Sequence, residues 1–186
     1  MVNPQKPPEP ILDRPLPNSY WVIPGRLLAG EHPIGSEEAR ARARLELLGQ
    51  AGIDCYIDLT EPDEQPEYRH LLPTRSEYLR SAIVDTGVPN NVSQTRELLA
   101  AIRAALARER GVYVHCRAGI GRTGLIMGCF LAEEEQDGKS AIKRLNRLWR
   151  QSARAQVWPK VPQTAEQADY IRHWPKLRKH GVQSEP

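Results

Sequence analysis

The stretch "VYVHCRAGIGRTGLIMGCF", residues 112–130, decides the fold that we expect for this chain. An apolar run leads into a His-Cys pair, a glycine-rich turn with an arginine follows, and a second apolar run closes the stretch. The first run, residues 112–114, predicts a buried strand, and the segment from Thr123 onward predicts a helix. Ligands of α/β sheets bind beyond the carboxyl ends of strands, so the turn is a candidate binding site.

The turn has the composition of an anion-binding loop. The first turn of a helix offers unpaired N–H groups at the positive end of the helix dipole. Gly119, Gly121 and Gly124 allow backbone angles that a side chain would forbid, so successive N–H groups can turn inward. The planar fork of Arg122 can hold two phosphate oxygens. The residues expected to surround the anion are Arg117, Ala118, Gly119, Ile120, Gly121 and Arg122.

Cys116 gives this site a reaction. Helix N-termini and nearby cations stabilise a thiolate, and a thiolate beneath a bound phosphate is an in-line nucleophile that forms a cysteinyl-phosphate. Thr123 can donate its hydroxyl to the sulfur, and His115 is expected to bond nearby backbone and hold the loop. The alternative is a structural core cysteine, which would not need the surrounding glycines and arginine.

Two other phosphate-binding loops fit the same stretch less well. A Walker-type loop needs a lysine after its glycines, and no lysine follows them here. The string "GIGRTG", residues 119–124, does match the GxGxxG pattern of dinucleotide-binding loops. The preceding His-Cys pair and the arginine inside the string favour the nucleophilic site.

The segment "HCRAGIGRTG", residues 115–124, resembles the HCxxGxxR[ST] loop of the protein tyrosine phosphatase superfamily at every defined position. The resemblance extends over about Tyr20 to Trp174. It implies an α/β fold with a central mixed, mainly parallel sheet flanked by helices. It also implies a phosphomonoester hydrolase that needs no metal or other cofactor. The chain is too short for the larger phosphotyrosine-specific domains, which points to the dual-specificity type.

Expulsion of an alkoxide or phenoxide requires a general acid on a loop that can cover the phosphate. Asp85 in "IVDTGVP" follows a predicted strand, and a role as a turn former is equally open on the residues alone. The resemblance favours the acid. Dual-specificity phosphatases of the cell-division-cycle and cyclin-kinase-associated groups carry a D-x-x-x-P loop at a similar distance before the cysteine. Here the distance is 116 − 85 = 31 residues, and Pro89 completes the pattern. The weaker rivals are Asp54, Asp58 and Asp63.

Hydrolysis of a cysteinyl-phosphate also requires a placed water molecule. The segment "VPQTAEQADYI", residues 161–171, resembles the glutamine loop of tyrosine phosphatases. By that resemblance Gln163 would orient the water and Gln167 would assist. The alternative is that Thr164 caps the last helix while both glutamines are solvated.

The sequence leaves several substrates and functions open. A phosphorylated protein or a small phosphorylated molecule is the expected substrate. Phosphoinositide phosphatases of the superfamily often carry lysines where this chain has Arg117 and Ile120, and the apolar Ile120 weakens the reading as an inositol phosphate or lipid phosphatase. A catalytically lapsed phosphate-binding module and, more weakly, a rhodanese-like sulfur carrier also stay open. Basic side chains in the long loop region could rim the pocket or be exposed: Arg69, His70, Arg75 and Arg80.

The whole chain predicts one phosphatase domain at residues 19–180, preceded by a proline-rich arm at 1–18 and followed by a tail at 181–186. A net charge of +3 is too small to indicate nucleic acid. No run is long and apolar enough for a membrane span, and the N-terminus does not read as a signal peptide. Three sparse cysteines predict reduced thiols in a cytoplasmic monomer without a metal site. Cys55 and Cys129 are expected in the core, and an oxidative Cys55–Cys116 disulfide is an open alternative.

The expected elements alternate along the chain. Short strands flank Pro24-Gly25, strands follow at 53–59, 80–84 and 111–116, and a long polar loop at 60–79 has the length of a functional loop. Helices are expected at 36–49 with Ser36 as the cap, at 93–108 with Ser93 as the cap, and at 122–135, 139–151 and 164–174.

Overall fold

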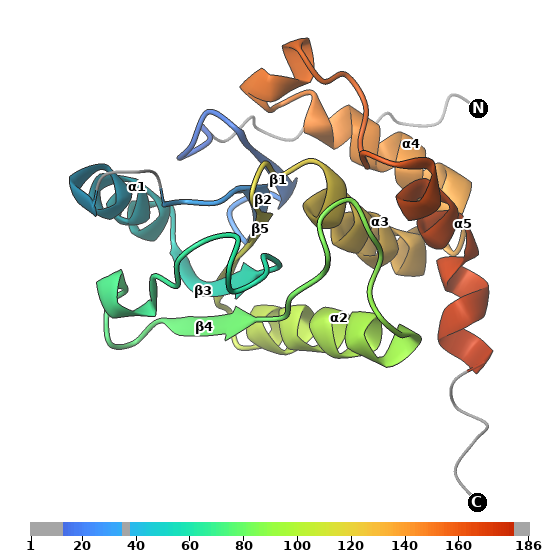
Figure 1. Ribbon diagram of the computed structural model, residues 1–186, viewed down its shortest axis with the longest axis horizontal. Coiled ribbons are helices and arrows are strands. Elements are labelled where there is room, and N and C mark those ends of the chain that lie inside the picture. The colour runs from blue at the N-terminus through green and yellow to red at the C-terminus, as the bar shows by residue number, and fades with distance from the viewer. Residues whose placement is uncertain (1–12, 35–37, 181–186) are drawn as a thin grey trace, which may run out of the picture.

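The described residues, 13–34 and 38–180, form a five-stranded sheet with helices on both faces in a computed structural model of the chain (Figure 1). The strands are β1 (Ser19–Ile23), β2 (Leu27–Glu31), β3 (Ile53–Asp58), β4 (Glu77–Arg80) and β5 (Gly111–Cys116). The helices are α1 (Glu38–Gln50), α2 (Val92–Ala107), α3 (Gly121–Glu135), α4 (Gly138–Trp149) and α5 (Ala165–His180). Two short 3-10 helices are η1 (Arg69–Leu71) and η2 (Ala153–Gln156).

The sheet has the order β1-β2-β5-β3-β4. β1 and β2 pair antiparallel, and the other neighbouring strands run parallel. The register places Cys116 beside Glu31 of β2, and His115 beside Asp58 of β3. The carboxyl ends of β2, β3 and β5 therefore bring their polar side chains to one edge. The mixed, mainly parallel sheet expected from the sequence is confirmed.

The two faces of the sheet pack against different helices, as Figure 1 shows. On one face, Leu45 and Leu48 of α1 pack with Tyr56 of β3 and Tyr113 of β5. The other face packs against α2 and α3, with α4 and α5 against α3. Helices on both faces explain why β5 is buried along its whole length, as its apolar sequence predicts.

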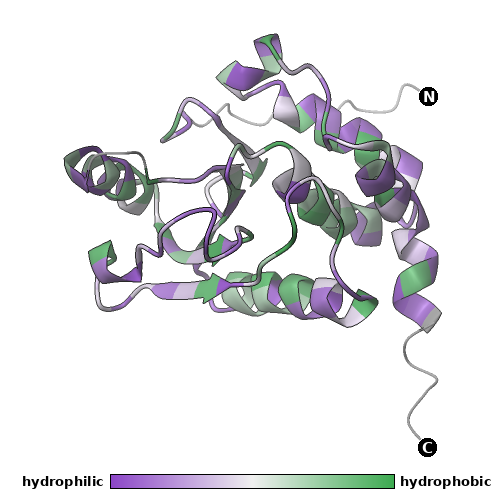
Figure 2. Cartoon of the chain, in the orientation of Figure 1, coloured by the Kyte–Doolittle hydropathy of each residue, from purple (hydrophilic) through white to green (hydrophobic). Residues whose placement is uncertain are grey.

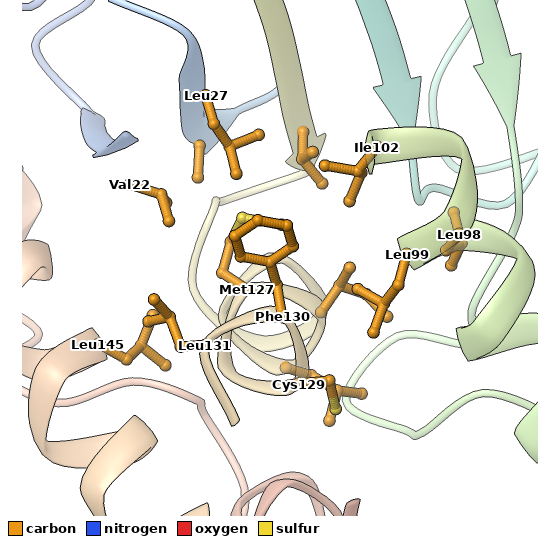
Figure 3. Close-up of a cluster of buried hydrophobic side chains, with 14 of the residues drawn as sticks. Val22, Leu27, Leu98, Leu99, Ile102, Met127, Cys129, Phe130, Leu131 and Leu145 are labelled. Carbon is orange, nitrogen blue, oxygen red and sulfur yellow. The ribbon is translucent and has the colours of Figure 1, made fainter. Parts of the chain in front are cut away.

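Helix α3 lies at the centre of the larger of the two hydrophobic clusters, on the face of the sheet that packs against α2 and α3. Residues 121–132 of α3 are all buried, and Figure 2 shows the helix as predominantly apolar beside the more polar α4 and α5. Met127 and Phe130 lie between Leu27 of β2 and Leu99 of α2 (Figure 3). Each fully buried side chain of this size contributes about 1.5–3 kcal/mol through its removal from water. The first turn of α3 is consequently fixed to the sheet edge where β5 ends.

Three expected boundaries were wrong. The strand expected at 80–84 lies earlier, at Glu77–Arg80, because this segment pairs with β3 in register; residues 81–84 then form no regular strand. Helix α2 begins at Val92, and its cap is Asn91, whose side chain accepts the Gln94 N–H, instead of Ser93. Helix α5 continues past Pro175 to His180. Ser36, the expected cap of α1, lies outside the described residues.

The expected N-terminal arm and tail fall largely on residues 1–12 and 181–186, which lie outside the described residues. The part of the arm that is described, residues 13–18, contacts the domain. Leu16 is buried with Trp21, and the Pro17 carbonyl accepts the N–H of Ala153. Across residues 13–34 and 38–180, no helix has the length and apolar character needed to cross a bilayer.

Candidate active site

The loop between β5 and α3 holds Cys116 at the sheet edge. Cys116 is 2% exposed and ends β5, and the loop turns through Gly119 into the first residue of α3. Gly119 has φ +74°, and a Cβ there would lie 2.5 Å from the backbone carbon of Gly30. Gly121 and Gly124 do not have positive φ. A Cβ on Gly124 would lie only 3.3 Å from Pro162, so this glycine serves close packing instead of an unusual backbone angle.

Arg122, in the first turn of α3, is buried beneath this loop. Its Nη1 and Nη2 donate to the two carboxylate oxygens of Glu64, at 2.5 and 2.6 Å, and Nη1 also donates to the Ile83 carbonyl at 3.1 Å. Nε of Arg122 is buried and has no hydrogen-bond partner among the described residues. A buried donor without a partner is costly, so this nitrogen is available to bond an anion that enters the loop.

Glu64 is a site residue that the sequence reasoning missed. Its hydrogen bonds with Arg122 lower the pKa of Glu64 below its usual range. Burial alone would lower the pKa of Arg122, but the bonds to Glu64 and the nearby negative charges raise it above its usual value. The pair therefore keeps both charges at neutral pH. Glu64 lies in the long polar loop whose length indicated function, but no pattern distinguished it from Glu61 or Glu67.

Asp85 reaches the same arginine. Its Oδ1 lies 3.0 Å from Nη2 of Arg122, and its side chain is 54% exposed. Asp85 Oδ1 also accepts the backbone N–H of Thr86 at 3.0 Å. Thr86 has φ +64°, a strained conformation for a β-branched residue. An exposed carboxylate joined to a buried arginine stands at the mouth of the anion site.

The rival acids are placed less favourably. Asp58 is fully buried, and Asp54 forms an ion pair with Arg110 at 3.3 Å. Asp63 is exposed in the loop that carries Glu64. Among these carboxylates, the ion pair with Arg122 sets Asp85 apart.

Gln163 and Gln167 both lie against the loop. A Cβ on Gly121 would be 3.0 Å from Oε1 of Gln163 and 3.1 Å from Nε2 of Gln167. Gln163 is exposed, whereas Gln167 is fully buried. Thr164 Oγ1 does accept the N–H of Gln167, as the capping alternative requires. The expectation that both glutamines are solvated is wrong for Gln167.

Two side chains that the sequence reasoning missed hold the loops in place. Asn146 of α4 bonds both backbone groups of Val161, at 2.7 and 3.0 Å, and so fixes the segment that leads to Gln163. Arg154 of η2 donates to the Ala118 carbonyl at 2.5 Å and pairs with Glu31 at 2.8 Å. No sequence motif marks either residue, because each acts only once distant segments are packed together.

The Tyr68 side chain contacts the His115 ring, and Thr123 does not make the bond expected of it. Nε2 of His115 lies 2.5 Å from the Tyr68 hydroxyl. The hydroxyl of Thr123 is buried, and within 13–34 and 38–180 it has no hydrogen-bond partner. Its expected bond to the sulfur of Cys116 is therefore absent from this arrangement.

Behind the loop, His32, Asp58 and His115 form a buried cluster with one candidate ligand atom from each within 4.8 Å of the others. The Ile34 N–H donates to Nδ1 of His32, which leaves the ring proton on Nε2, 3.7 Å from Asp58 Oδ2. Tyr68 can likewise donate to His115, whose Nδ1 lies 3.8 Å from Asp58 Oδ1. When Tyr68 donates, both neutral rings turn N–H groups, and not lone pairs, toward the carboxylate.

The carboxylate of Asp58 in this cluster already has hydrogen-bond donors and a positive charge as partners. Its carboxylate accepts hydrogen bonds from Thr60, Tyr78 and Arg80. Burial alone would raise the pKa of Asp58, but the nearby His32 ring and the bonds from Thr60 lower it below its usual range. With a guanidinium already bound, the cluster is suited to supporting the end of β5 and poorly suited to a metal cation.

We expect the protein to lose stability as the pH falls from about 6.5 towards 3. Burial lowers the pKa of His115 to about 3, whereas an unfolded histidine titrates near 6.5. Between these values the unfolded chain binds the additional proton, so the unfolding free energy falls by up to ~1.4 kcal/mol per pH unit. Urea unfolding of wild type and His115→Gln at several pH values measures the slope. The slope should be shallower in His115→Gln and unchanged in the exposed control His70→Gln; equal slopes in all three proteins contradict the assignment.

The register of the sheet decides whether Cys55 and Cys116 are close enough to form a disulfide. Cys55 pairs with Val112, four residues before Cys116 on β5. At about 3.3 Å per residue, the two cysteines lie ~13 Å apart along the strands, and a disulfide requires Cα atoms within about 7 Å. This fold therefore does not allow a Cys55–Cys116 disulfide. Cys129 is free and buried on α3, as expected.

Comparisons with known proteins agree with this geometry. Residues 31–136, more than half of the chain, match the family described as "Polymorphic toxin system, DSP-PTPase phosphatase". Protein 067L of Invertebrate iridescent virus 3, which is named as a tyrosine phosphatase, is 35% identical over 94 residues. That match covers 48% of this chain and 38% of the viral protein, so the chain spans well under half the length of this relative.

Solved structures share the fold. Tk-PTP in its active form has a TM-score of 0.69 at 22% identity, covering 86% of this chain and 97% of that chain. Kinase associated phosphatase has a TM-score of 0.68 at 20% identity, covering 82% of this chain and 87% of that chain. With the family match over residues 31–136, these likenesses support one conclusion. The chain belongs to the DSP-PTPase phosphatase family of polymorphic toxin systems.

Proposed function

We propose that this protein is a cysteine-dependent phosphomonoester hydrolase of the tyrosine or dual-specificity type. The observation that carries the proposal is Arg122, buried at the first turn of α3 with its Nε unpaired, in the loop that begins at Cys116. Nε of Arg122 and the N–H groups of the loop form a cradle for a phosphoryl group, while Glu64 occupies the two terminal nitrogens of the arginine fork. Cys116 supplies the nucleophile at the base of the same loop.

In the first step, the sulfur of Cys116 attacks phosphorus while the bond to the leaving oxygen breaks. The charge on the equatorial oxygens is stabilised by Arg122 and by backbone N–H groups between Arg117 and Arg122. Asp85 gives its proton to the leaving oxygen. Its contact with Nη2 of Arg122 puts this carboxyl beside the cradle, within reach of the leaving oxygen of a bound substrate.

In the second step, water attacks the phosphorus of the cysteinyl-phosphate and the sulfur leaves as a thiolate. Asp85, now ionised, takes a proton from this water, and Gln163 orients it. The exposed Gln163 side chain beside Gly121 supports this role. Thr123, whose hydroxyl has no partner among the described residues, is proposed to donate to the sulfur as the S–P bond breaks, because negative charge returns to the sulfur in this step. Inorganic phosphate is then released.

The substrate class proposed is a phosphorylated protein. Arg117 is exposed beside the cradle, whereas Ile120 is 7% exposed and packs into the core, so only one of the two positions offers a cation. Two arginines of the long loop region make other contacts, because Arg80 binds Asp58 and Arg69 lies over the Tyr78 ring, whereas Arg75 is exposed. These contacts support an inositol phosphate or phosphoinositide less well as the substrate than a phosphorylated protein. A panel of phosphopeptides, inositol phosphates and phosphoinositides separates the candidates.

The proposal includes a reducing compartment such as the cytoplasm and a monomeric protein that needs no metal. The chemistry of the cysteines supports the reducing compartment. Cys55, Cys116 and Cys129 are free thiols in this fold, and a nucleophilic thiolate must stay reduced to act.

Replacing Asp85 by asparagine tests the assigned acid. We expect Asp85→Asn to lower kcat/KM for phenyl phosphate by about 100-fold, because a poor leaving group needs the proton. An activated nitrophenyl phosphate should slow only a few-fold. Steady-state turnover of a series of aryl phosphates measures this dependence on the leaving group. Asp63→Asn, in the neighbouring loop, is the matched control and should change neither rate. Equal slowing of good and poor leaving groups by Asp85→Asn would assign the acid elsewhere.

A further inference from the structure

The buried Gln167 joins two loops that the reaction uses separately. Its Oε1 accepts the backbone N–H groups of Gln163 at 3.1 Å and Thr164 at 3.2 Å. Its Nε2 donates to the carbonyl of Gly87 at 2.9 Å. Gly87 lies two residues after Asp85, so a single side chain ties the loop of the proposed acid to the loop of the proposed water-orienting residue.

A second bond runs between the same two loops. The hydroxyl of Thr164 donates to the Thr86 carbonyl at 3.3 Å. Thr86 is the residue with φ +64°, a conformation that persists only where surrounding contacts hold it. The two bonds to residues 86 and 87 are contacts of that kind. Pro89, four residues after Asp85, is buried at the far end of the loop.

These contacts leave Gln167 little freedom to assist a water molecule. Both functional atoms of its amide are bonded to backbone, and its side chain is fully buried. Gln163, by contrast, has an exposed side chain. The role expected for Gln167 from the family resemblance is therefore not the role that its contacts favour.

We infer that Gln167 is a positioning residue for the general acid: it latches the Asp85 loop against the Gln163 loop and so holds the Asp85 carboxyl beside Arg122. Without the latch, the turn keeps its local bonds, from the Thr86 N–H to Asp85 and from the Gly87 N–H to the Val84 carbonyl, but its tie to the Gln163 loop is reduced to the longer Thr164 bond. The loop then samples conformations in which the carboxyl no longer reaches the leaving oxygen. This inference rests on the proposed function, because it assigns Gln167 to the acid step of that reaction.

The test uses kcat/KM, which reports only steps up to the departure of the leaving group. Gln167→Met keeps the length and burial of the side chain and removes all three bonds. We expect this variant to lower kcat/KM for phenyl phosphate by about 10-fold and for an activated nitrophenyl phosphate by less than about 2-fold. In an Asp85→Asn background, adding Gln167→Met should produce no further dependence on the leaving group, since both changes remove the same proton transfer.

Gln151 provides a matched control. It makes the same kind of bridge elsewhere, accepting the Trp21 N–H at 3.0 Å and donating to the Trp21 carbonyl at 3.1 Å. Gln151→Met should cost comparable stability, measured as a change in Tm, with no change in the leaving-group dependence. Gln167→Glu is a second variant in case the methionine fails to fold. When ionised it keeps the two N–H acceptor bonds and loses only the bond to Gly87.

The outcomes separate the possible failures. A steeper leaving-group dependence in Gln167→Met, absent in Gln151→Met, supports the latch. A drop in kcat with unchanged kcat/KM overturns it, because Gln167 would then serve only the water step. Equal slowing of all substrates overturns it as well, since that is the mark of a purely structural role. If wild type is inactive or Cys116→Ser is active, the proposed function fails first, and this result is distinguishable from loss of the latch alone.

Discussion

Cys116→Ser is expected to abolish turnover of an aryl phosphate while the protein still binds inorganic phosphate. The hydroxyl of serine is a far weaker nucleophile than a thiolate. Loss of a nucleophile of this kind lowers kcat by about 10⁴-fold or more. Binding persists because Arg122 and the backbone N–H groups are untouched. Phosphate release assays and calorimetric titration with inorganic phosphate measure the two properties separately.

The cysteines elsewhere in the chain supply the control for this experiment. Cys55 is buried in β3, about four residues along the sheet from Cys116, and the mechanism does not use it. Cys55→Ser should keep turnover within a few-fold of wild type. Mass spectrometry of the acid-quenched enzyme should find phosphate on Cys116 in wild type. Appreciable metal-free turnover by Cys116→Ser would contradict the proposed mechanism, whereas loss of both turnover and phosphate binding would indicate a collapsed loop.

The nucleophilic loop could be predicted from the sequence because its information is local. A strand, a glycine with left-handed backbone and a helix N-terminus follow one another within residues 111–124, and each has a residue pattern of its own. The parallel sheet could also be predicted, because strands alternate with helices along the chain. The role of Asp85 could not be predicted from its residue pattern alone. Its position on the chain fits a turn-forming residue as well as a general acid, and only the resemblance to known phosphatases favoured the general acid. Its contact with Arg122 now supports that choice.

The parts of the site that could not be predicted depend on contacts between distant segments. Glu64 binds Arg122 across 58 residues, Arg154 reaches Ala118 across 36, and Gln167 reaches Gly87 across 80. No pattern marks Glu64 or Arg154, because polar residues in loops are usually solvated, and the pattern that marks Gln167 does not indicate its bond to Gly87. Loop packing alone decides which of them is buried.

Arg122→Lys is expected to lower kcat/KM by about 1,000-fold, although it keeps the positive charge. Lysine lacks the planar fork, so it cannot hold the two oxygens of Glu64 and also present a nitrogen, the unpaired Nε, to the phosphoryl group. Removal of one well-placed donor to a developing anion costs about 100- to 1,000-fold, and lysine loses more than one. The Ile83 carbonyl would also lose its partner.

The measurement that separates charge from geometry is turnover together with phosphate affinity, in Arg122→Lys and in Arg103→Lys. Arg103, on α2, also pairs with a glutamate, Glu133. Its side chain is 45% exposed and the proposed mechanism does not use it, so its replacement should leave both properties unchanged.

If the cradle acts only through its net charge, Arg122→Lys would retain most of the activity, and this outcome would contradict the role given to the fork. If the fork is held for the transition state, kcat should fall more than phosphate affinity, because the ground-state anion still finds the backbone N–H groups. That difference would also indicate why Glu64 binds both terminal nitrogens. Glu64 would then fix the guanidinium plane before substrate arrives, with Nε already aligned with the oxygens on which charge develops.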